Sequence, residues 1–434
     1  MHDFRYQRGV LHCEEVSLEA LARRFGTPLY VYSRHTLTDH FQKLDRALAP
    51  LDRLVCYAVK ANSNLAVLRT LANLGAGFDI VSEGELRRVI AAGGDPARCV
   101  FAGVGKTERE IAFALRRGIY SFNVESVPEL GRINRVAARL GRVAPVAVRV
   151  NPNVDAGTHA KITTGTYENK FGIAFEDIEA LYARAARLKH LRLRGLQMHI
   201  GSQLTEVRPF RLAVEKVAPL VQRLHARHGF DFLSVGGGLG IVYRPALASG
   251  DPHWWAAEGA HKILTPQSYA ETLRPLLEPL GLKILLEPGR FIMGNAGALV
   301  TRVEYVKRTG HRNFVIVDAA MNDLIRPAFY DSYHEIVPVK RRRGPEVDAD
   351  VVGPICESGD YFAKDRPLPR VGEGDLLALL SAGAYGSVMG SNYNSRALAA
   401  EVLVDGRRAA LVRERQALEE IWAHERVPAW LQRP

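Results

Sequence analysis

Long apolar runs are missing from this sequence of 434 residues. No stretch of about 18 consecutive apolar residues occurs, so we expect no membrane-spanning helix. The first residues, MHDFRYQRGVLHCEEVS, are polar with scattered charge, and they lack the apolar centre of a secretory signal. We therefore expect a cytoplasmic protein without a membrane partner.

Cysteine is scarce as well. The chain has four cysteines, which are Cys13, Cys56, Cys99 and Cys356. None belongs to a C-x-x-C pair, and none stands near histidines at the spacing of a metal site. Because disulfide frameworks are typical of short secreted chains, we expect neither structural disulfides nor a bound metal. Cys56 and Cys99 lie in apolar runs and are predicted to be core residues.

Nucleic-acid-binding motifs are also missing, although the net charge is +11. The basic residues are spread along the chain. The one dense cluster, residues 340–343 (KRRR), is followed by Gly-Pro and an acidic stretch at 346–350, as in a solvated loop. Charge alone would favour a nucleic-acid binder. Without a recognition motif, we instead predict an arginine-rich surface and no nucleic-acid partner.

A regular alternation of strand-like and helix-like segments runs from about residue 34 to residue 292. The predicted strands are 54–59, 77–81, 99–102, 121–124, 146–150, 193–200, 232–236 and 283–286. The predicted helices are 64–74, 83–92, 108–117, 127–140, 175–188, 209–228 and 266–280. Such alternation predicts a parallel sheet with right-handed crossovers. Eight units over about 250 residues fit a closed (β/α)8 barrel of the TIM type.

An open, doubly wound sheet is the alternative fold. It would need a Gly-rich turn after its first strand, which AVKANSN does not supply. We therefore predict an α/β protein in which residues 34–292 form the barrel.

The flanking segments, 1–33 and 293–434, are predicted to form a second, mostly β domain. After residue 288, strand-like runs alternate with turns rich in Gly, Pro and Asn. These runs are 298–307, 313–318, 335–339, 348–352, 376–380 and 399–404. Near the start, a helix over 17–25 is predicted, with Ser17 as its N-cap and Gly26 as its stop. Residues 253–263 (HWWAAEGAHKI) are predicted to be a surface excursion.

Lys60 stands directly after the first barrel strand, LVCYAV. Burying an ammonium group is costly unless the group is paired or neutralised. A desolvated lysine loses its proton more easily and can then form a Schiff base. A surface lysine just past the strand is the ordinary alternative, because lysine is rarely buried. The other strand ends decide between the two interpretations.

Polar residues and glycines occupy most of those other strand ends. In a barrel these ends meet on one face, where active sites lie. They supply Asp79, Ser82, Glu83, Arg149, Asn151, His199, Gly201, Ser202, Gly236, Gly237, Gly238, Glu287, Pro288, Gly289 and Arg290. Their convergence predicts a functional site that includes Lys60.

Two glycine-containing turns follow the seventh and eighth strands, at residues 235–240 (VGGGLG) and at Gly289 with Arg290. Successive backbone N–H groups can hold an anion, and barrels frequently bind phosphate at these two loops. Glycines also simply make tight turns. Together the two turns predict a phosphate site.

Glu287 and His199 are the other two candidate site residues at the strand ends. Glu287 can pair with a protonated ring nitrogen, or alternatively with Arg149 or Arg290. His199 can be a ligand, an acid/base group, a stacking platform or a hydrogen-bonded core histidine. A Schiff-base lysine, a phosphate loop, a carboxylate and an aromatic platform together describe a pyridoxal phosphate site.

Seven motifs occur in a fixed order over nearly the whole chain. They are YAVKAN, HIGSQL, VGGGLG, EPGR, RPAFYDSYHEI, CESGDYFAKDR and GAYGSVMGSNYNSR. In these motifs the sequence resembles the diaminopimelate decarboxylases, of the alanine-racemase/ornithine-decarboxylase class. The resemblance implies a barrel with a β domain, pyridoxal 5'-phosphate as cofactor, and conversion of meso-2,6-diaminopimelate to L-lysine and CO2, the last step of lysine biosynthesis.

The resemblance also implies roles for individual residues. Lys60 is expected to form the Schiff base, His199 to stack on the pyridine ring and Glu287 to pair with its nitrogen. The other expected cofactor-binding residues are Ser202, Gly238, Pro288, Gly289, Arg290 and Tyr385. The expected substrate-binding residues are Arg290, Arg326, Tyr330, Glu357 and Tyr385. Cys356, the expected proton donor, and Glu357 come from the neighbouring subunit of a homodimer with shared active sites. The catalytic set is then Lys60, His199 and Cys356.

A decarboxylase of another basic amino acid, such as D-ornithine or D-lysine, is the nearest alternative function. Diaminopimelate has a distal carboxylate, to which Arg326 offers a bidentate partner, whereas ornithine has only an amine there. Without the resemblance, an ion pair at a strand–helix junction would be the default role of Arg326. A racemase leaves the CESGD segment without a role. A non-catalytic pyridoxal phosphate carrier needs neither Arg326 nor Cys356.

Overall fold

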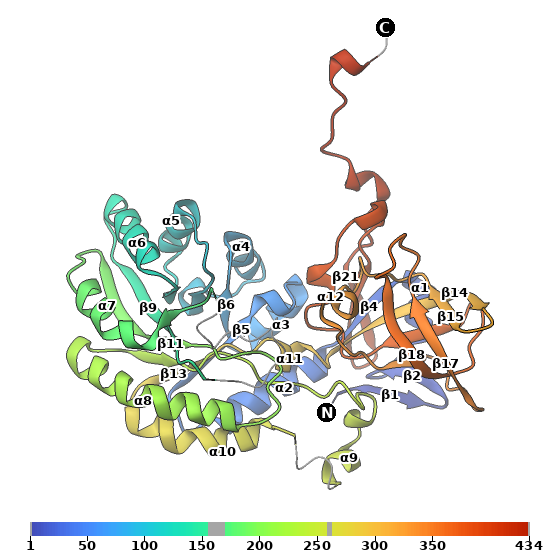
Figure 1. The fold of residues 1–434 in the computed structure, drawn as a ribbon, viewed down its shortest axis with the longest axis horizontal. Coiled ribbons are helices and arrows are strands. Elements are labelled where there is room, and N and C mark those ends of the chain that lie inside the picture. Colours follow the sequence, from blue (N-terminus) through green and yellow to red (C-terminus); the bar gives the residue numbers. More distant parts are fainter. Residues whose placement is uncertain (1, 155–169, 258–262, 433–434) are drawn as a thin grey trace. The chain divides into compact units, whose positions relative to one another are not determined.

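The computed structural model describes residues 2–154, 170–257 and 263–432. The chain divides into two units (Figure 1). The barrel unit comprises the described residues of Thr36–Val242 and Asp251–Gly294. The β unit comprises the segment that ends at His35, the segment Tyr243–Gly250 and the residues from Asn295 onward. Tyr243–Gly250, predicted from the sequence to be part of the barrel, thus belongs to the β unit.

Eight parallel strands close into a barrel, which confirms the predicted fold class. They are β5 (Arg53–Ala58), β6 (Gly77–Ile80), β7 (Cys99–Phe101), β8 (Ser121–Val124), β9 (Ala144–Asn151), β11 (Leu191–Met198), β12 (Phe232–Ser234) and β13 (Lys283–Leu286). Each strand pairs with the next one named, and β13 pairs back to β5. The two-residue β10 (Ile173–Ala174) extends the pairing at the end of β9. The ring excludes the open, doubly wound alternative.

Most helices of the barrel unit begin at a residue whose side chain accepts a backbone N–H of the first turn. The helices of this unit are α2 (Arg34–Ala47), α3 (Leu65–Asn73), α4 (Glu83–Ala91), α5 (Glu108–Arg117), α6 (Val127–Arg139), α7 (Ile178–Ala185), α8 (Arg208–His228), α9 (Pro252–Ala256), α10 (Pro266–Leu277) and α11 (Arg290–Met293). In α5, Thr107 and Glu110 exchange side-chain and backbone hydrogen bonds as a capping box, and Gly118 ends the helix at φ 69°. The predicted excursion at 253–263 begins in α9, while 258–262 lie outside the described residues.

Side chains fill the interior of the barrel. Leu54 and Cys56 are two residues apart on β5 and therefore point to the same side of the strand. They share one buried cluster with Val100, Ala147, Phe232 and Leu285. Cys56 and Cys99 are buried free thiols, as predicted. Because the interior is apolar and packed, polar chemistry is confined to the strand ends.

The β unit is built around a mixed sheet. Its strands are β4 (Leu29–Ser33), β14 (Gly297–Arg308), β15 (Asn313–Val317), β16 (Ile336–Pro338), β17 (Glu346–Val352), β18 (Tyr361–Pro369), β19 (Leu376–Leu379), β20 (Ala400–Asp405) and β21 (Arg408–Arg413). Strand β4 pairs antiparallel with β14 and parallel with β20, so both ends of the chain join one sheet. The short helix α12 (Arg326–Tyr330) follows β15.

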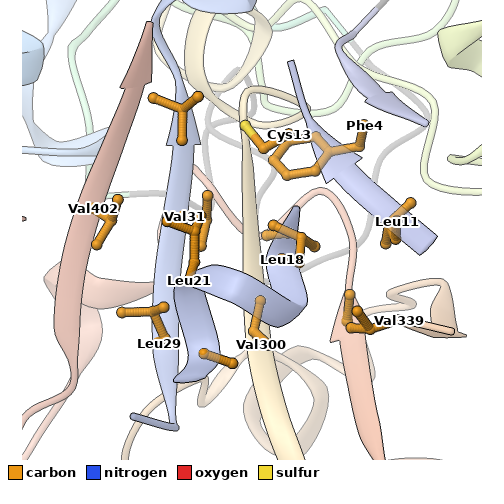
Figure 2. Packing of buried hydrophobic residues seen from close by; sticks show 14 of the residues in the cluster. Phe4, Leu11, Cys13, Leu18, Leu21, Leu29, Val31, Val300, Val339 and Val402 are labelled. Carbon is orange, nitrogen blue, oxygen red and sulfur yellow. The ribbon is translucent and has the colours of Figure 1, made fainter. Parts of the chain in front are cut away.

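Helix α1 (Leu18–Phe25) covers part of this sheet. Ser17 caps it by accepting a hydrogen bond from the N–H of Ala20, and Gly26 ends it at φ 73°, as predicted. Its Leu18 and Leu21 belong to a buried cluster with side chains of β2 (Val10–Cys13), β4, β14 and β20 (Figure 2). This cluster joins the N-terminal and C-terminal segments in one core.

The sequence patterns do not predict strands β18 and β21, nor the small sheet of β1 (Phe4–Gln7), β2 and β3 (Val16–Ser17). Strand β18 contains three charged residues and two prolines, which argue against a strand in sequence. The structure places it at an edge, where it pairs with β17 alone. A proline costs less at an edge because one side of the strand needs no ladder hydrogen bonds.

None of the helices in the described ranges is long and apolar enough to cross a membrane.

A buried ion pair ties the ends of β7 and β8 to helix α6. Lys106 is 3% exposed, and its Nζ lies 2.7 Å from Oε1 of Glu129. The same ammonium donates hydrogen bonds of 2.8 Å to the carbonyl oxygens of Gly103 and Asn123. Glu129 also accepts the backbone N–H of Glu125 at 2.8 Å. The pair therefore fixes the ends of two neighbouring barrel strands.

The Lys106→Ala variant should lower the free energy of unfolding by about 3–5 kcal/mol, because it leaves the Glu129 carboxylate buried without its cation. Urea denaturation of the cofactor-free protein measures the loss. Replacing both partners, Lys106→Met with Glu129→Leu, should recover most of it. A loss below about 1 kcal/mol in the single variant, the range of surface ion pairs, would contradict the structural role of this pair.

Candidate active site

Lys60 lies in a short 3-10 turn, Val59–Ala61, directly after β5. Its Nζ is 2.6 Å from Oδ2 of Asp79, which is buried in the neighbouring strand β6. The lysine side chain is 42% exposed and Asp79 is 1% exposed. The ammonium is therefore reachable from solvent, while a buried carboxylate holds it in place. This arrangement differs from that of an unanchored surface lysine.

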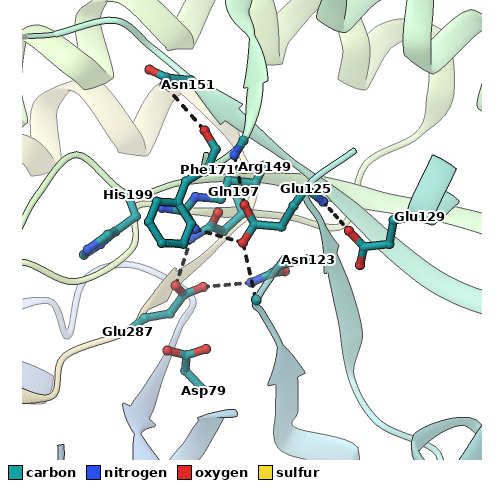
Figure 3. Close-up of polar contacts among 12 residues, drawn as sticks. Asp79, Asn123, Glu125, Glu129, Arg149, Asn151, Phe171, Gln197, His199 and Glu287 are labelled. Carbon is teal, nitrogen blue, oxygen red and sulfur yellow. Dashed lines mark hydrogen bonds and ion pairs between the residues drawn. The ribbon is translucent and has the colours of Figure 1, made fainter. Parts of the chain in front are cut away.

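Glu287 follows β13, and three neutral side chains bind its carboxyl group; Figure 3 labels two of them, Asn123 and Gln197. Asn123 donates to Oε1 at 3.2 Å, Ser234 donates to Oε1 at 2.7 Å, and Gln197 donates to Oε2 at 2.9 Å. These donors come from β8, β12 and β11, so four strand ends orient one carboxyl group. None of these three donors is among the site residues predicted from the sequence. The available signal was a polar residue within an otherwise apolar strand, as in SFNV and FLS.

The alternative in which an arginine neutralises Glu287 is wrong for the described part of the barrel unit. Arg149 forms its ion pair with Glu125, at 2.9 Å, and its guanidinium lies 4.7 Å from the ring centre of Phe171. Arg290 donates to Oγ of Ser202 at 3.2 Å. No ion pair to Glu287 is found among these residues. Its charge therefore remains available to a bound group.

Burial raises the pKa of Glu287 to about 7, and the nearby Asp79 carboxylate acts in the same direction. Three buried oxygens at this place, Asp79 Oδ1, Asn123 Oδ1 and Gln197 Oε1, have no hydrogen-bond partner. Amide and carboxylate oxygens only accept hydrogen bonds. The pocket around Glu287 thus suits a cation or an N–H donor rather than another anion.

His199 follows β11, and its Nδ1 accepts the backbone N–H of Gly237 at 3.2 Å. The proton of the neutral ring is therefore assigned to Nε2. Burial, together with the charges of Arg149 and Lys60, lowers the pKa of His199 well below its ordinary value. A neutral, anchored imidazole is suited to stacking on a flat ring.

The glycines after β12 approach the neighbouring strand ends too closely for any side chain. A Cβ at Gly236, Gly237 or Gly238 would lie 2.3, 2.2 or 2.6 Å, respectively, from a main-chain oxygen. Gly236 and Gly238 also have φ values of 72° and 114°, which L side chains rarely adopt. This turn therefore joins the ends of β11, β12 and β13 into one compact cradle.

The turn after β13 holds the predicted Pro288, Gly289 and Arg290. The carbonyl of Pro288 accepts the N–H of Ala58 at 2.9 Å, which ties this turn to the strand that carries Lys60. Arg290 is 7% exposed and begins α11 after Gly289. Its contact with Ser202 places a cation and a hydroxyl group side by side, a pair that suits an anion.

Five of the predicted site residues lie in the β unit. Arg326 begins α12 and is 5% exposed. Its guanidinium donates to Tyr243 Oη at 2.8 Å, to His334 Nε2 at 3.2 Å and to Ser332 Oγ at 3.3 Å. His334 is held in the accepting tautomer, because its Nδ1 donates to the carbonyl of Leu380 at 2.9 Å.

These partners of Arg326 are all neutral. Within the described residues of the β unit, Arg326 forms no ion pair, so the ion-pair alternative is wrong there. A buried guanidinium held by neutral acceptors keeps its charge available for a carboxylate.

Cys356 and Glu357 are exposed on a turn after β17. The N–H of Cys356 donates to Oδ1 of Asn394 at 3.0 Å. Asp360, at the end of the turn, accepts the N–H of Ile355 at 2.7 Å and so closes it. The turn therefore presents a free thiol and a carboxylate at the surface of the β unit.

Tyr385 and Tyr330 are both partly buried. Tyr385 has a φ of 57°, in the left-handed region that a bulky residue rarely adopts. Backbone strain of this kind is typical of functional positions. Tyr330 ends α12, and its ring packs against Phe329 with the ring centres 4.6 Å apart.

Comparisons with known proteins agree with this geometry. A family model described as pyridoxal-dependent decarboxylase, pyridoxal binding domain, matches residues 34–294. The chain is 53% identical over 429 residues to the diaminopimelate decarboxylase of Pseudomonas aeruginosa, covering 98% of this chain and 99% of that one. It is 51% identical over 434 residues to the Vibrio cholerae enzyme, with coverage of 98% and 99%. The chain belongs to the diaminopimelate decarboxylases.

A solved structure of this family has the same fold. Diaminopimelate decarboxylase from M. jannaschii, in complex with L-lysine, is 35% identical in sequence and superimposes with a TM-score of 0.91. The match covers 100% of both chains. The family recognised from the motifs is thus confirmed, and with it a pyridoxal-phosphate-dependent carboxy-lyase.

The barrel residues fit the cofactor of the diaminopimelate decarboxylases. The acceptor-rich pocket around Glu287 suits a protonated ring nitrogen, and Arg290 with Ser202 suits a phosphate. Lys60 offers a reachable amino group in the same unit. When bound, pyridoxal 5'-phosphate takes up the electron pair of the bond broken at the substrate's Cα.

The raised pKa of Glu287 predicts a pH-dependent stability of the cofactor-free protein. Between about pH 4.5 and 7, the folded protein holds a proton at Glu287 that the unfolded chain has released. The contribution of Glu287 to the free energy of unfolding should therefore fall as pH rises through this window. Glu287→Gln should remove this contribution, which amounts to up to roughly 3 kcal/mol.

Urea denaturation on both sides of that pH window measures the effect. The exposed Glu278→Gln serves as the control and should keep the wild-type pH dependence. Equal pH dependence in Glu287→Gln and the wild type would show that Glu287 ionises normally in the folded protein.

Proposed function

We propose that this chain converts meso-2,6-diaminopimelate to L-lysine and CO2 with pyridoxal 5'-phosphate, as the last step of lysine biosynthesis. Full-length similarity to diaminopimelate decarboxylases supports the reaction. The observation that supports this choice of substrate is that Arg326 is a buried guanidinium whose protein partners are neutral. It can receive the distal carboxylate that D-lysine and D-ornithine lack.

In this proposal the barrel residues hold the cofactor. Lys60 binds it covalently through its amino group, which Asp79 keeps in place. Glu287 would give its proton to the ring nitrogen, since the cation formed beside it would offset the desolvation that raises its pKa. His199 stacks on the ring in its neutral form.

The phosphate is bound by the turns after β11, β12 and β13. Ser202 and Arg290 supply a hydroxyl group and a cation, while Gly238, Pro288 and Gly289 shape the backbone around them. Tyr385 of the β unit adds its hydroxyl group. Arg290 and Tyr385 also contact the substrate in this proposal, as does Tyr330.

The proton that replaces the lost carboxylate comes from Cys356, and Glu357 receives the distal ammonium. Both residues are exposed on one turn, so they can enter the site of another copy. We therefore include a homodimer with shared active sites. We also include a cytoplasmic location, which the four free thiols support, because thiols persist in reducing compartments.

Product analysis tests the reaction. Incubated with meso-diaminopimelate, D-ornithine and D-lysine in parallel, the enzyme should release CO2 and L-lysine from meso-diaminopimelate, and only when cofactor is present. Faster turnover of D-ornithine or D-lysine would instead favour a decarboxylase of another basic amino acid.

The Arg326→Gln variant tests whether Arg326 binds the distal carboxylate of the substrate. Loss of a charged hydrogen bond of about 1.5–3 kcal/mol should raise KM for meso-diaminopimelate roughly 10- to 100-fold. The cofactor absorbance should not change. An unchanged KM would remove Arg326 from the substrate site.

Mixing two inactive variants tests the shared site. Lys60→Ala should lose both turnover and the visible absorbance of the bound cofactor, whereas Cys356→Ala should keep the absorbance but turn over slowly. In an equal mixture, half the dimers are mixed and each has one intact site. About a quarter of wild-type activity should therefore return.

The control mixture pairs Lys60→Ala with Glu287→Ala. Both changes lie in the barrel unit, so a mixed dimer has no intact site and should stay inactive. No recovery in the first mixture, with subunit exchange shown by two affinity tags, would place Cys356 in the site of its own chain.

A further inference from the structure

The C-terminal segment after β21 exposes a series of large apolar side chains. We call residues 417–432 the C-terminal arm; it contains the 3-10 turns Leu418–Ile421 and Ala429–Leu431. Figure 1 shows the arm leading away from the strands of the β unit. The exposed fractions are 54% for Leu418, 49% for Trp422, 65% for Val427, 80% for Trp430 and 58% for Leu431.

This apolar area is large for a segment of 16 residues. The two indole rings alone leave on the order of 300 Å² in contact with water. The largest apolar patch on a typical monomer is about 300–600 Å², and a stable interface buries about 800 Å² on each partner. Tryptophan is also one of the residues enriched among those that dominate interface energy. The arm thus has the composition of a docking segment.

The base of the arm is held by the loop that also holds the Cys356 turn. Gln416 Oε1 accepts hydrogen bonds from Asn392 Nδ2 at 2.6 Å and from the N–H of Leu398 at 3.2 Å. Asn394, in the same loop, accepts the N–H of Cys356 at 3.0 Å. The arm therefore leaves the β unit beside the turn that we propose for the site of a second copy.

Charge favours this chain itself as the partner. The arm contains three glutamates, Glu419, Glu420 and Glu425, and one arginine, Arg426, whereas the whole chain has a net charge of +11. An acidic segment is attracted to a basic protein surface. Nucleic acids and anionic membranes would repel it, because their binding depends on basic residues.

We propose that the C-terminal arm docks on a second copy of this chain, with Trp422 and Trp430 as its apolar anchors. The arm then holds together the dimer in which the Cys356 turn of one copy enters the active site of the other. This inference rests on the shared-site homodimer of the proposed function.

Sedimentation of three variants as holoenzymes tests whether the arm stabilises the dimer. The first is truncated after Gln416, the second is Trp422→Ala/Trp430→Ala, and the third, the control, is Tyr305→Ala. Tyr305 is a 61% exposed aromatic residue of β14, outside the arm. Loss of two anchors should raise the dimer dissociation constant at least about 100-fold. The control should dissociate like the wild type.

Specific activity measured as a function of protein concentration distinguishes an effect of the arm on dimer formation from an effect on the reaction itself. Specific activity of the double variant should fall on dilution and return to the wild-type value at concentrations where dimers form, with unchanged cofactor absorbance. Arm variants with the wild-type dissociation constant would overturn the proposal, as would a full-length chain that is monomeric. Arm variants that stay dimeric but lose cofactor would show that the arm packs on its own barrel unit. Failure of the full-length enzyme to decarboxylate meso-diaminopimelate would instead refute the proposed reaction.

Discussion

Burial of one carboxyl group at the ends of the barrel strands is the constraint on which the site depends. Glu287 is held by Asn123, Gln197 and Ser234, all neutral donors. They orient the carboxyl group without neutralising it, so desolvation raises its pKa to about 7. An arginine in their place would cancel the charge permanently. The structure instead keeps a buried acid whose charge a cation can restore, which is the electrostatic requirement of a protonated pyridine ring.

Barrel closure produces that arrangement. Donors from β8, β11 and β12 reach the carboxyl group after β13 only because parallel strands end on the same face of a closed ring. The same closure brings the glycine cradle against the ends of β11 and β13, where a single added Cβ would collide with a carbonyl oxygen. It also sets Lys60 beside Asp79 on the neighbouring strand. The Lys106–Glu129 pair supports the structure from the side of β7 and β8.

Local patterns predicted the elements well where each pattern has a local physical cause. The strands of the barrel read as short apolar runs, and Ser17 and Gly26 marked the ends of α1 because capping depends on adjacent residues. Strand β18 was not predicted, because its prolines and charged residues are tolerated only in an edge strand. Whether a strand lies at an edge depends on the order of all strands in the sheet. The roles of Asn123, Gln197 and Ser234 could not be predicted for a similar reason. The role of a single polar residue in an apolar strand becomes clear only when its hydrogen-bond partner, up to 164 residues away, is known.

The sequence by itself determined the succession of elements, the closed barrel with a β domain, the family and the identity of Lys60, Glu287 and Arg326 as candidates. These follow from periodicity, capping and motifs, which act over a few residues. Only the tertiary structure decided the partners of those candidates. It paired Lys60 with Asp79, surrounded Glu287 with neutral donors and left Arg326 with neutral acceptors. The physical reason is that pKa values and available charge depend on burial and on distant neighbours, which chain order alone does not specify.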